Sequence, residues 1–249
     1  QDVVYAATYG GIKRSTDGGT SWATVLGGAF SNSQSYYTDV AITSGGVVYA
    51  TLSQANSAGT SSPSRGVWRS TDGVTWANIT PAGYPSTYTR FTIGKAPSNQ
   101  DHIYFFGETS GSGTLGHTIY KYSYISGDGS GAGGSWADRS ANVPAFGGSV
   151  GNYSSQGSYD MYIKVKPDDE NVVFVGGTNL YRSTDGFASS ANTTWIGGYS
   201  PANDVSQYAS HHPDQHALVF SPVSSTTMFT GDDGGVQQTT DNLANNPGT

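Results

Sequence analysis

Short hydrophobic stretches recur along the whole chain, and polar, glycine-rich segments separate them. Residues 47–50, 103–105 and 172–175 are rich in Val, Ile, Tyr and Phe, which favour strands. Residues 66–70 and 179–183 alternate hydrophobic and polar side chains with the period of two that a half-buried strand requires. No segment sustains the 3.6-residue period of an amphipathic helix. The pattern therefore predicts an all-β protein of short strands joined by many turns.

A repeated motif divides the chain into similar units. Five segments consist of Ser or Thr, any residue, and then Asp, and a tryptophan follows the first four of them. The spacing between successive copies is about 56 residues, which is the scale of a propeller blade. The repeated aspartates are Asp17, Asp72, Asp128, Asp185 and Asp241.

Each unit contains four predicted strands. Two hydrophobic stretches come first, an alternating stretch then leads into the motif, and a fourth strand starts at the tryptophan. Four antiparallel strands in one repeat are typical of a blade of a β-propeller. The chain holds three complete blades, an N-terminal blade without its first strand and a C-terminal blade without its last. We therefore expect residues 1–249 to form part of one propeller that further blades of the same protein, or another chain, complete.

The motif resembles that of a known family. Residues 15–22 match the Asp-box (BNR repeat) pattern Ser-x-Asp-x-Gly-x-x-Trp at every fixed position. The second copy is one residue shorter, the third and fourth have longer loops before the tryptophan, and the fifth has none. Asp-box β-propellers include sialidases, xyloglucanase-type glycoside hydrolases, sortilin-type receptors and a photosystem assembly factor. The resemblance therefore implies the fold and does not select an activity.

The repeated aspartates are expected to be structural. The motif looks like the hairpin turn between the third and fourth strands of a blade. Its carboxylate can accept backbone N–H bonds, its glycines can adopt positive φ, and its tryptophan can pack beneath the turn. Asp17, Asp72, Asp128, Asp185 and Asp241 are therefore predicted to stabilise turns and not to catalyse.

Composition excludes several classes of function. The 249 residues contain no cysteine, which excludes disulfide scaffolds, thiol catalysis and cysteine-ligated zinc. The formal net charge is −7, and only 11 residues are Lys or Arg, so nucleic acid and anionic membrane surfaces are not expected partners. No apolar stretch has the length of about 18 residues that a membrane-spanning helix needs.

The expected location is extracellular or at the cell surface. Residues 214–218 and 231–236 resemble segments of large secreted bacterial Asp-box proteins. A chain that begins at Gln1, without Met or a basic leader, is also what a mature secreted chain or an internal piece would look like.

Aromatic residues concentrate in the loops that join one blade to the next. These loops hold eight of the 17 tyrosines. A loop tyrosine offers a flat apolar face and a hydroxyl group at low entropic cost, which suits stacking on sugars and contact with proteins. We therefore expect a module that binds a polysaccharide or glycoprotein, although the rings could instead cover the blade tops. The tyrosines are Tyr36, Tyr37, Tyr84, Tyr88, Tyr153, Tyr159, Tyr199 and Tyr208.

Several carboxylates are predicted at the mouth of the propeller channel, on the same face as these loops, and they allow a second hypothesis. A glycoside hydrolase of the xyloglucanase type would need two of them about 5–5.5 Å apart for retention or about 6.5–9.5 Å apart for inversion. A third hypothesis is a protein-binding propeller in a surface or secretion assembly, as in the sortilin-type receptors. The candidate catalytic carboxylates are Asp39, Asp160, Asp214, Asp232 and Asp233.

Residues 211–216 are rich in histidine. On an extended strand His212, Asp214 and His216 would project from one face and could bind a metal ion. The alternative is structural, because alignment of the repeats places His216 in register with the packing residues Phe91 and Met161. A metal ion at these three residues is thus the one possible cofactor, and no other is expected.

Overall fold

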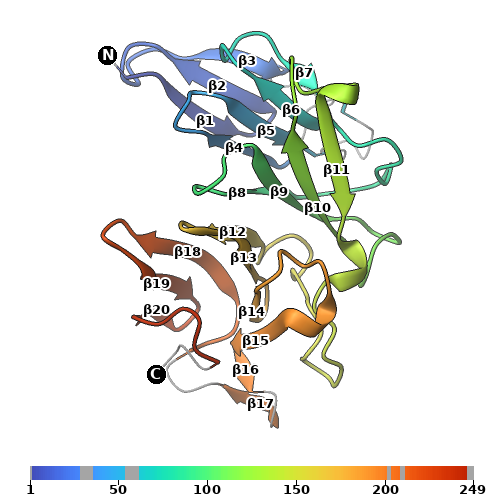
Figure 1. The fold of residues 1–249 in the computed structure, drawn as a ribbon, viewed down its shortest axis with the longest axis vertical. Helices are drawn as coiled ribbons and strands as arrows, with labels where there is room; N and C mark the ends of the chain where they lie inside the picture. Colours follow the sequence, from blue (N-terminus) through green and yellow to red (C-terminus); the bar gives the residue numbers. More distant parts are fainter. Residues whose placement is uncertain (1, 29–35, 54–61, 201–202, 208–210, 246–249) are drawn as a thin grey trace. The chain divides into compact units, whose positions relative to one another are not determined.

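The computed structural model describes residues 2–28, 36–53, 62–200, 203–207 and 211–245. These residues form short strands and three single-turn 3-10 helices, as Figure 1 shows. None of the described helices has the length and apolar character needed to cross a membrane. The predicted all-β class is therefore confirmed.

The chain forms two compact units. The first comprises Gln1–Lys95, Gln100–Ser110 and Lys121–Ala137, and the second comprises Ala96–Asn99, Gly111–Tyr120 and Asp138–Thr249.

Two sheets belong to the first unit. One has the order β1-β2-β3, and the other has the order β4-β5-β6-β7. Their strands are antiparallel, and the register of β1 with β2 runs from Val4 opposite Ser15 to Thr8 opposite Gly11. The strands are β1 Val4–Thr8, β2 Gly11–Ser15, β3 Ala23–Gly27, β4 Thr38–Ile42, β5 Val48–Leu52, β6 Gly66–Ser70 and β7 Ala77–Asn78.

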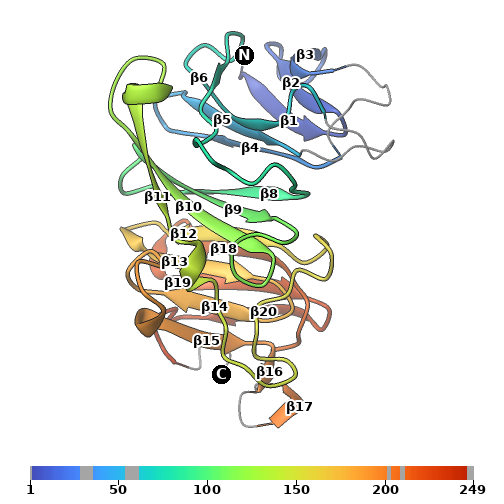
Figure 2. The ribbon, with the colours of Figure 1, turned by 90° about the vertical axis from the view of Figure 1, so that its right-hand side faces the viewer.

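A four-stranded sheet with the order β11-β10-β9-β8 follows. Strands β8 and β9 belong to the first unit, and β10 and β11 each contain residues of both units. Strand β8 of this sheet lies beside β4 of the preceding sheet (Figure 2). Its elements are β8 Phe91–Lys95, β9 His102–Glu108, β10 His117–Tyr124, η1 Gly131–Gly133 and β11 Gly134–Asp138, with η2 Ser140–Asn142 after it.

The second unit contains a four-stranded sheet, β12-β13-β14-β15, and a three-stranded sheet, β18-β19-β20. A two-stranded hairpin, β16-β17, lies between them in sequence, where the repeat pattern predicted only a loop. The elements are β12 Tyr162–Lys166, β13 Asp169–Gly176, β14 Leu180–Ser183, η3 Ser190–Asn192, β15 Thr193–Gly197, β16 Tyr199–Ser200, β17 Asn203–Gln207, β18 Gln215–Ser221, β19 Ser224–Asp232 and β20 Gly235–Thr239.

The sheets have the strand content that the repeat predicts. Within the described residues, three sheets have four strands, and the first and last sheets of the repeat have three. The fold class is thus a β-propeller type with three complete and two partial blades, as the sequence predicted.

Hydrophobic clusters join successive sheets within each unit. In the first unit, Ile12 of β2 packs with Leu52 of β5, and Tyr49 of β5 packs with Phe105 of β9. In the second unit, Phe174 of β13 belongs to one buried cluster with Leu218 of β18 and Met228 of β19. Burial of such side chains contributes roughly 1.5–3 kcal/mol each, so the packed sheet faces supply most of the stability.

The Ser-x-Asp segments form closely hydrogen-bonded turns. Asp17 Oδ1 accepts hydrogen bonds from the Ser21 backbone N–H at 2.8 Å and the Ser15 hydroxyl at 2.7 Å. Asp72, Asp128, Asp185 and Asp241 likewise accept backbone N–H bonds from residues two to four positions further on. Bonds to the charged form, those from Ser21 above all, lower the pKa of Asp17 to about 2.

The tryptophans after these turns lie in different environments. The Trp22 side chain donates from Nε1 to the Gly19 carbonyl oxygen at 2.9 Å, yet 42% of the residue is exposed. Trp195 is 6% exposed and belongs to the interior of the second unit. The expectation that the tryptophan packs beneath the turn is therefore wrong for Trp22, whose ring lies over the turn from outside.

Two buried arginines each link one sheet to the Ser-x-Asp turn of the following repeat. Arg69 on β6 donates to the Asp128 carbonyl oxygen at 3.2 Å, and Arg182 on β14 donates to the Asn242 carbonyl oxygen at 2.9 Å. Arg69 also donates from Nε to the hydroxyl oxygen of Tyr49 at 3.3 Å. These contacts lie within one unit each, and they fix the spacing of neighbouring sheets.

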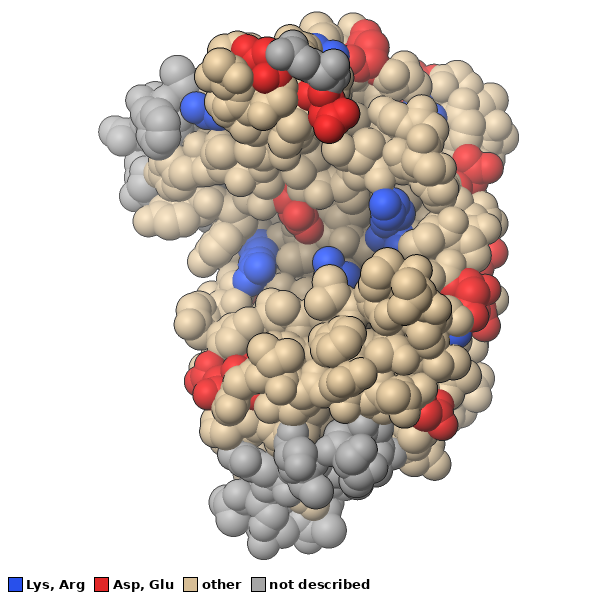
Figure 3. All heavy atoms as spheres, turned by 90° about the vertical axis from the view of Figure 1, so that its left-hand side faces the viewer, with Lys and Arg blue, Asp and Glu red and all other residues tan. Residues whose placement is uncertain are grey.

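Charged side chains are sparse. On the face of the molecule in Figure 3, acidic and basic side chains are scattered among uncharged atoms. This distribution agrees with the low content of charged residues in the sequence, 12%.

Candidate functional site

Three loops of the second unit are joined by backbone hydrogen bonds. The Thr178 N–H donates to the Ser154 carbonyl oxygen at 2.8 Å, and the Asp214 N–H donates to the Thr178 carbonyl oxygen at 2.9 Å. The Gln215 N–H donates to the Gly177 carbonyl oxygen at 2.8 Å. The segment before β12, the β13–β14 turn and the segment before β18 therefore form one rigid frame.

Strained backbone concentrates in this frame. Gln156, Ser158 and Asp214 have φ of 48°, 73° and 67°, in the left-handed region that non-glycine residues seldom adopt. The Ser155 hydroxyl accepts the Ser158 N–H at 3.2 Å, and the Ser155 carbonyl oxygen accepts the Asp160 N–H at 3.0 Å. Strain of this kind persists where surrounding contacts impose it, and it is frequent at binding sites.

The His216 imidazole and the exposed Tyr159 ring, with the side chains that contact them, form the outer layer of the site. His216 Nε2 lies 2.6 Å from Asp233 Oδ1, and His216 Nδ1 lies 3.3 Å from Asp160 Oδ1. The Tyr159 ring meets the His216 ring edge-on with 5.3 Å between centroids, and 67% of Tyr159 is exposed. Gln156 donates from Nε2 to Asp214 Oδ1 beside them. The outer layer therefore offers one open aromatic face beside fixed polar groups.

Asp160 is a buried carboxyl with an altered protonation equilibrium. Burial and, to a lesser extent, the negative charge of Asp214 raise the pKa of Asp160 to about 6, against the opposing effect of His216. Both carboxyl oxygens are enclosed, and apart from the ion-pair contact of Oδ1 with His216 neither has a hydrogen-bond partner among the described residues. When Asp160 is protonated, near pH 6, its O–H can donate a hydrogen bond to the neighbouring Asp214 carboxylate.

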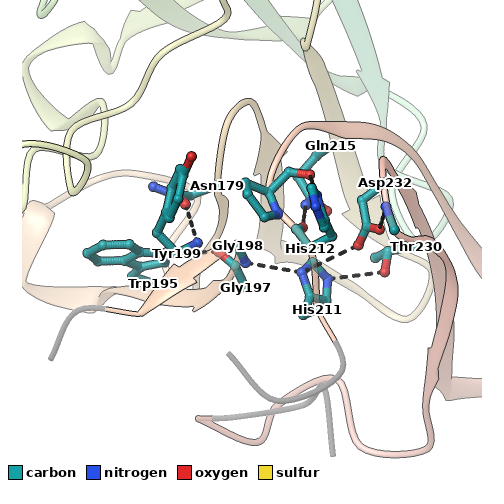
Figure 4. Close-up of polar contacts among 12 residues, drawn as sticks. Asn179, Trp195, Gly197, Gly198, Tyr199, His211, His212, Gln215, Thr230 and Asp232 are labelled. Atoms are coloured by element: carbon teal, nitrogen blue, oxygen red, sulfur yellow. Dashed lines mark hydrogen bonds and ion pairs between the residues drawn. The ribbon is translucent and has the colours of Figure 1, made fainter. Parts of the chain in front are cut away.

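His211 forms the inner layer, which Figure 4 shows. The Gly198 N–H donates to His211 Nδ1 at 3.1 Å, His211 Nε2 lies 3.2 Å from Thr230 Oγ1, and Asp232 Oδ2 lies 3.7 Å from Nδ1. Burial lowers the pKa of His211, so the neutral ring is favoured. Because Nδ1 accepts from Gly198, the proton lies on Nε2, which donates to Thr230. His211 therefore joins β19 to the backbone between β15 and β16.

Four of the five predicted catalytic carboxylates belong to the second unit, and two of these four are enclosed. Asp160 is 0% exposed, and the side chain of Asp232 is 0% exposed while its Oδ1 accepts the Gly234 N–H at 2.9 Å. Asp39 belongs to the first unit, where its carboxylate accepts backbone N–H bonds from Val40 and Ile93 at 2.8 and 2.9 Å. Asp214 and Asp233 are the candidates whose carboxylates reach the surface.

The structure does not assemble the predicted metal site. Strand β18 begins at Gln215, and Asp214 has positive φ, so the assumed i, i+2, i+4 strand geometry is wrong. His212 Nδ1 lies 3.0 Å from the Pro213 carbonyl oxygen, while Asp214 and His216 have the partners given above. Among the residues that the structure describes, no three His, Asp or Glu side chains are arranged to hold a metal ion. His216 is also exposed, which corrects the alternative that it is buried between blades.

The predicted binding tyrosines differ widely in exposure. Tyr36 is 49% exposed and Tyr159 is 67% exposed, whereas Tyr88 and Tyr153 are each 3% exposed. Tyr153 donates from its hydroxyl to the Gly176 carbonyl oxygen at 2.9 Å, so its assignment to ligand binding is corrected to a role in packing. Half-buried positions are taken by Tyr37, Tyr84 and Tyr199, and Tyr208 lies outside the described residues.

Sequence reasoning missed two residues of the site. Gln156 belongs to the site through its hydrogen bond to Asp214, and His211 belongs to it through its buried contacts with Gly198 and Thr230. No motif marks Gln156, because it lies in a polar loop without a repeat. His211 lies in the histidine-rich segment that was noticed, but the strand-spacing argument selected its neighbours.

No family model matches the chain, and no curated protein matches it. Solved structures do resemble it. With the GH74 xyloglucanase from Xanthomonas campestris the TM-score is 0.56 at 16% identity, covering 97% of this chain and 35% of that one. With an ancestral GH74 enzyme the TM-score is 0.56 at 20% identity, covering 97% and 30%. With YCF48 from Cyanidioschyzon merolae it is 0.51 at 14% identity, covering 94% and 64%.

These neighbours are β-propellers, and at such identities the likeness shows the fold alone. The chain spans less than two thirds of the length of each of them.

Proposed function

We propose that this chain is a glycan-binding β-propeller module of the Asp-box type, active outside the cell or at its surface. The observation that carries the proposal is the exposed Tyr159 ring beside the fixed His216 and Asp233 side chains. The hydrogen-bonded Ser-x-Asp turns support the Asp-box assignment.

The outer layer has the chemistry that a sugar ring needs. The C–H face of a pyranose can pack on the Tyr159 ring, which is rigid and loses little entropy on binding. Asp233, whose side chain is 49% exposed, can accept hydrogen bonds from sugar hydroxyls. Because the Asp233 contact already orients the His216 ring, the polar groups are preorganised, which reduces the cost of association.

Binding is favoured over hydrolysis by the burial of the carboxylates. A general acid must reach the glycosidic oxygen, and Asp160, whose pKa is raised to about 6, is enclosed on both oxygens. Asp232 is likewise closed to a substrate. Of the two surface carboxylates, Asp214 already accepts a hydrogen bond from Gln156, and Asp233 already contacts His216.

Affinity electrophoresis in gels that contain one of the neutral polysaccharides xyloglucan, arabinan, galactan or mannan tests this proposal. We expect at least one polysaccharide to retard the chain, and we expect Tyr159→Ala to weaken that retardation at least about tenfold, a loss of about 1.4 kcal/mol. Trp22→Ala removes an exposed aromatic residue elsewhere and should leave the retardation unchanged. No reducing sugar should be released in a parallel assay.

Two results would contradict the proposal. One is the absence of retardation in every gel, and the other is a Tyr159→Ala variant that migrates like the wild type. Release of reducing ends that depends on Asp214 or Asp233 would favour the glycoside hydrolase instead.

A further inference from the structure

The first unit contains an open cavity of about 430 Å³ beside the sheet β4–β7. Residues before and at the start of β6, residues at and after the end of β7, and the loop over residues 81–88 line it. The lining includes Arg65, Gly66, Asn78, Thr80, Tyr84 and Tyr88, and no Asp or Glu. This volume lies in the range of small-ligand sites, about 300–1,000 Å³.

Glycine at position 66 makes room for the polar floor of the cavity. Gly66 has φ of 130°, and an added Cβ would lie 2.5 Å from Thr80 Oγ1. Thr80 Oγ1 accepts the Val67 N–H at 2.9 Å, and Asn78 Oδ1 accepts the Thr80 N–H at 2.9 Å. Each of these oxygens thus already accepts one backbone hydrogen bond, and the two side chains also carry donors, the Asn78 amide N–H groups and the Thr80 hydroxyl proton.

Arg65 places a positive charge at the same cavity. Its guanidinium donates from Nη1 to the Ser62 carbonyl oxygen at 3.4 Å, and within the described part of the chain it pairs with no carboxylate. The residue is exposed, so its remaining N–H groups are accessible. A donor-rich, positive cavity is distinctive in a chain whose net charge is −7.

An aromatic wall completes the cavity. The Tyr84 ring is stacked on Phe91, with 4.8 Å between centroids and 24° between planes, and it meets the Tyr88 ring at 5.3 Å. Tyr88 is buried, so it acts as a fixed support and contributes little open surface. Tyr84 is half-buried and lines the cavity.

We propose that this cavity binds the carboxylate-bearing unit of an acidic oligosaccharide, that is, a uronic acid residue. The sugar carboxylate would accept the guanidinium N–H groups of Arg65 in the paired geometry that arginine favours. Asn78 and Thr80 would donate to ring hydroxyls, and the sugar would pack on Tyr84. The site belongs to the first unit and does not depend on the proposal for Tyr159.

Calorimetric titration with trigalacturonate and with its methyl ester tests the charge requirement. The two probes differ only in the carboxylates, so we expect the acid to bind at least about tenfold tighter. That preference should shrink at high salt, because screening weakens contacts between exposed charges.

Variants test the residue assignment. Arg65→Gln should weaken trigalacturonate binding at least about tenfold. The affinity of Arg65→Lys should lie between those of Arg65→Gln and the wild type, because lysine keeps the positive charge but lacks the paired N–H groups of the guanidinium. Lys13→Gln removes one positive charge from the same unit and should bind like the wild type. Tyr159→Ala should also bind trigalacturonate normally, which separates this proposal from the preceding one.

Three results would overturn the inference. They are equal binding of the acid and the ester, an Arg65→Gln variant that binds like the wild type, and the absence of heat at millimolar trigalacturonate. Competition by inorganic phosphate at equal concentration would show a general oxyanion site and would overturn the assignment to a sugar.

Discussion

Arg69 donates a hydrogen bond across 59 residues to the carbonyl oxygen of Asp128, and Arg182 makes the corresponding bond to Asn242 across 60 residues. The sequence repeat is therefore also a repeat of contacts, since the third strand of one sheet binds the Ser-x-Asp turn of the next. Arg69 adds a cation–π contact, with its guanidinium carbon 4.1 Å from the Tyr124 ring centroid.

Arg69→Ala should destabilise the first unit by about 1–3 kcal/mol, because it removes a buried guanidinium whose charged hydrogen bonds join the Asp128 carbonyl oxygen and the Tyr49 hydroxyl. Arg14 is the matched control. It donates to the Tyr5 hydroxyl at 3.2 Å and is half-buried where Arg69 is buried, so Arg14→Ala should cost less. Urea denaturation measures both, and equal losses would contradict the assignment.

The turn at Asp17 should make stability depend on pH in acid. Its pKa is lowered to about 2 from the ordinary value of 3.8, mainly by bonds from Ser21. The stabilisation is therefore present above pH 3.8 and is lost as the pH falls towards 2. Melting temperatures of the wild type and Asp17→Asn should differ at pH 7 and converge near pH 2. A constant difference over this range would show that the charge is not responsible.

Asp160 should have the opposite dependence. Its pKa is raised from 3.8 to about 6, so between these values the folded chain holds a proton that the unfolded chain has released. The associated stability is complete below pH 3.8 and is lost as the pH rises through 6. Asp160→Asn imitates the protonated form and should raise the melting temperature more at pH 8 than at pH 4. A variant that is less stable at both pH values would argue against this account.

His211 should destabilise the second unit in mild acid. Burial lowers its pKa, so below the unfolded value of about 6.5 the unfolded chain binds a proton that the folded chain resists. Stability should therefore fall as the pH drops through 6.5. His211→Gln should be less stable than the wild type at pH 7 and should lose less between pH 7 and pH 5. Parallel pH profiles would exclude His211 as the source.

The repeat predicted the fold well because each blade is encoded locally. The hydrophobic stretch over 47–50 became part of β5 Val48–Leu52, and the stretch over 172–175 became part of β13 Asp169–Gly176. The hairpin β16-β17 was missed, because no strong hydrophobic alternation marks the loop over residues 198–212.

The candidate site was only partly predictable, because loop conformation decides it. Asp160, Asp233 and His216 were identified as candidates from the sequence, but their mutual contacts were not. The metal hypothesis assumed an extended strand at Asp214, whereas this residue has φ of 67°. Composition does not reveal such a conformation, since tertiary contacts impose it.

The links made by the arginines have a consequence for synthesis on the ribosome. Arg69 leaves the ribosome 59 residues before its acceptor Asp128, and Arg182 leaves 60 residues before Asn242. In each pair the donor strand can therefore already be folded when the new turn emerges. In these two pairs the completed sheet provides a binding point for the next turn, so the two sheets of each pair can pack in the order in which they are translated.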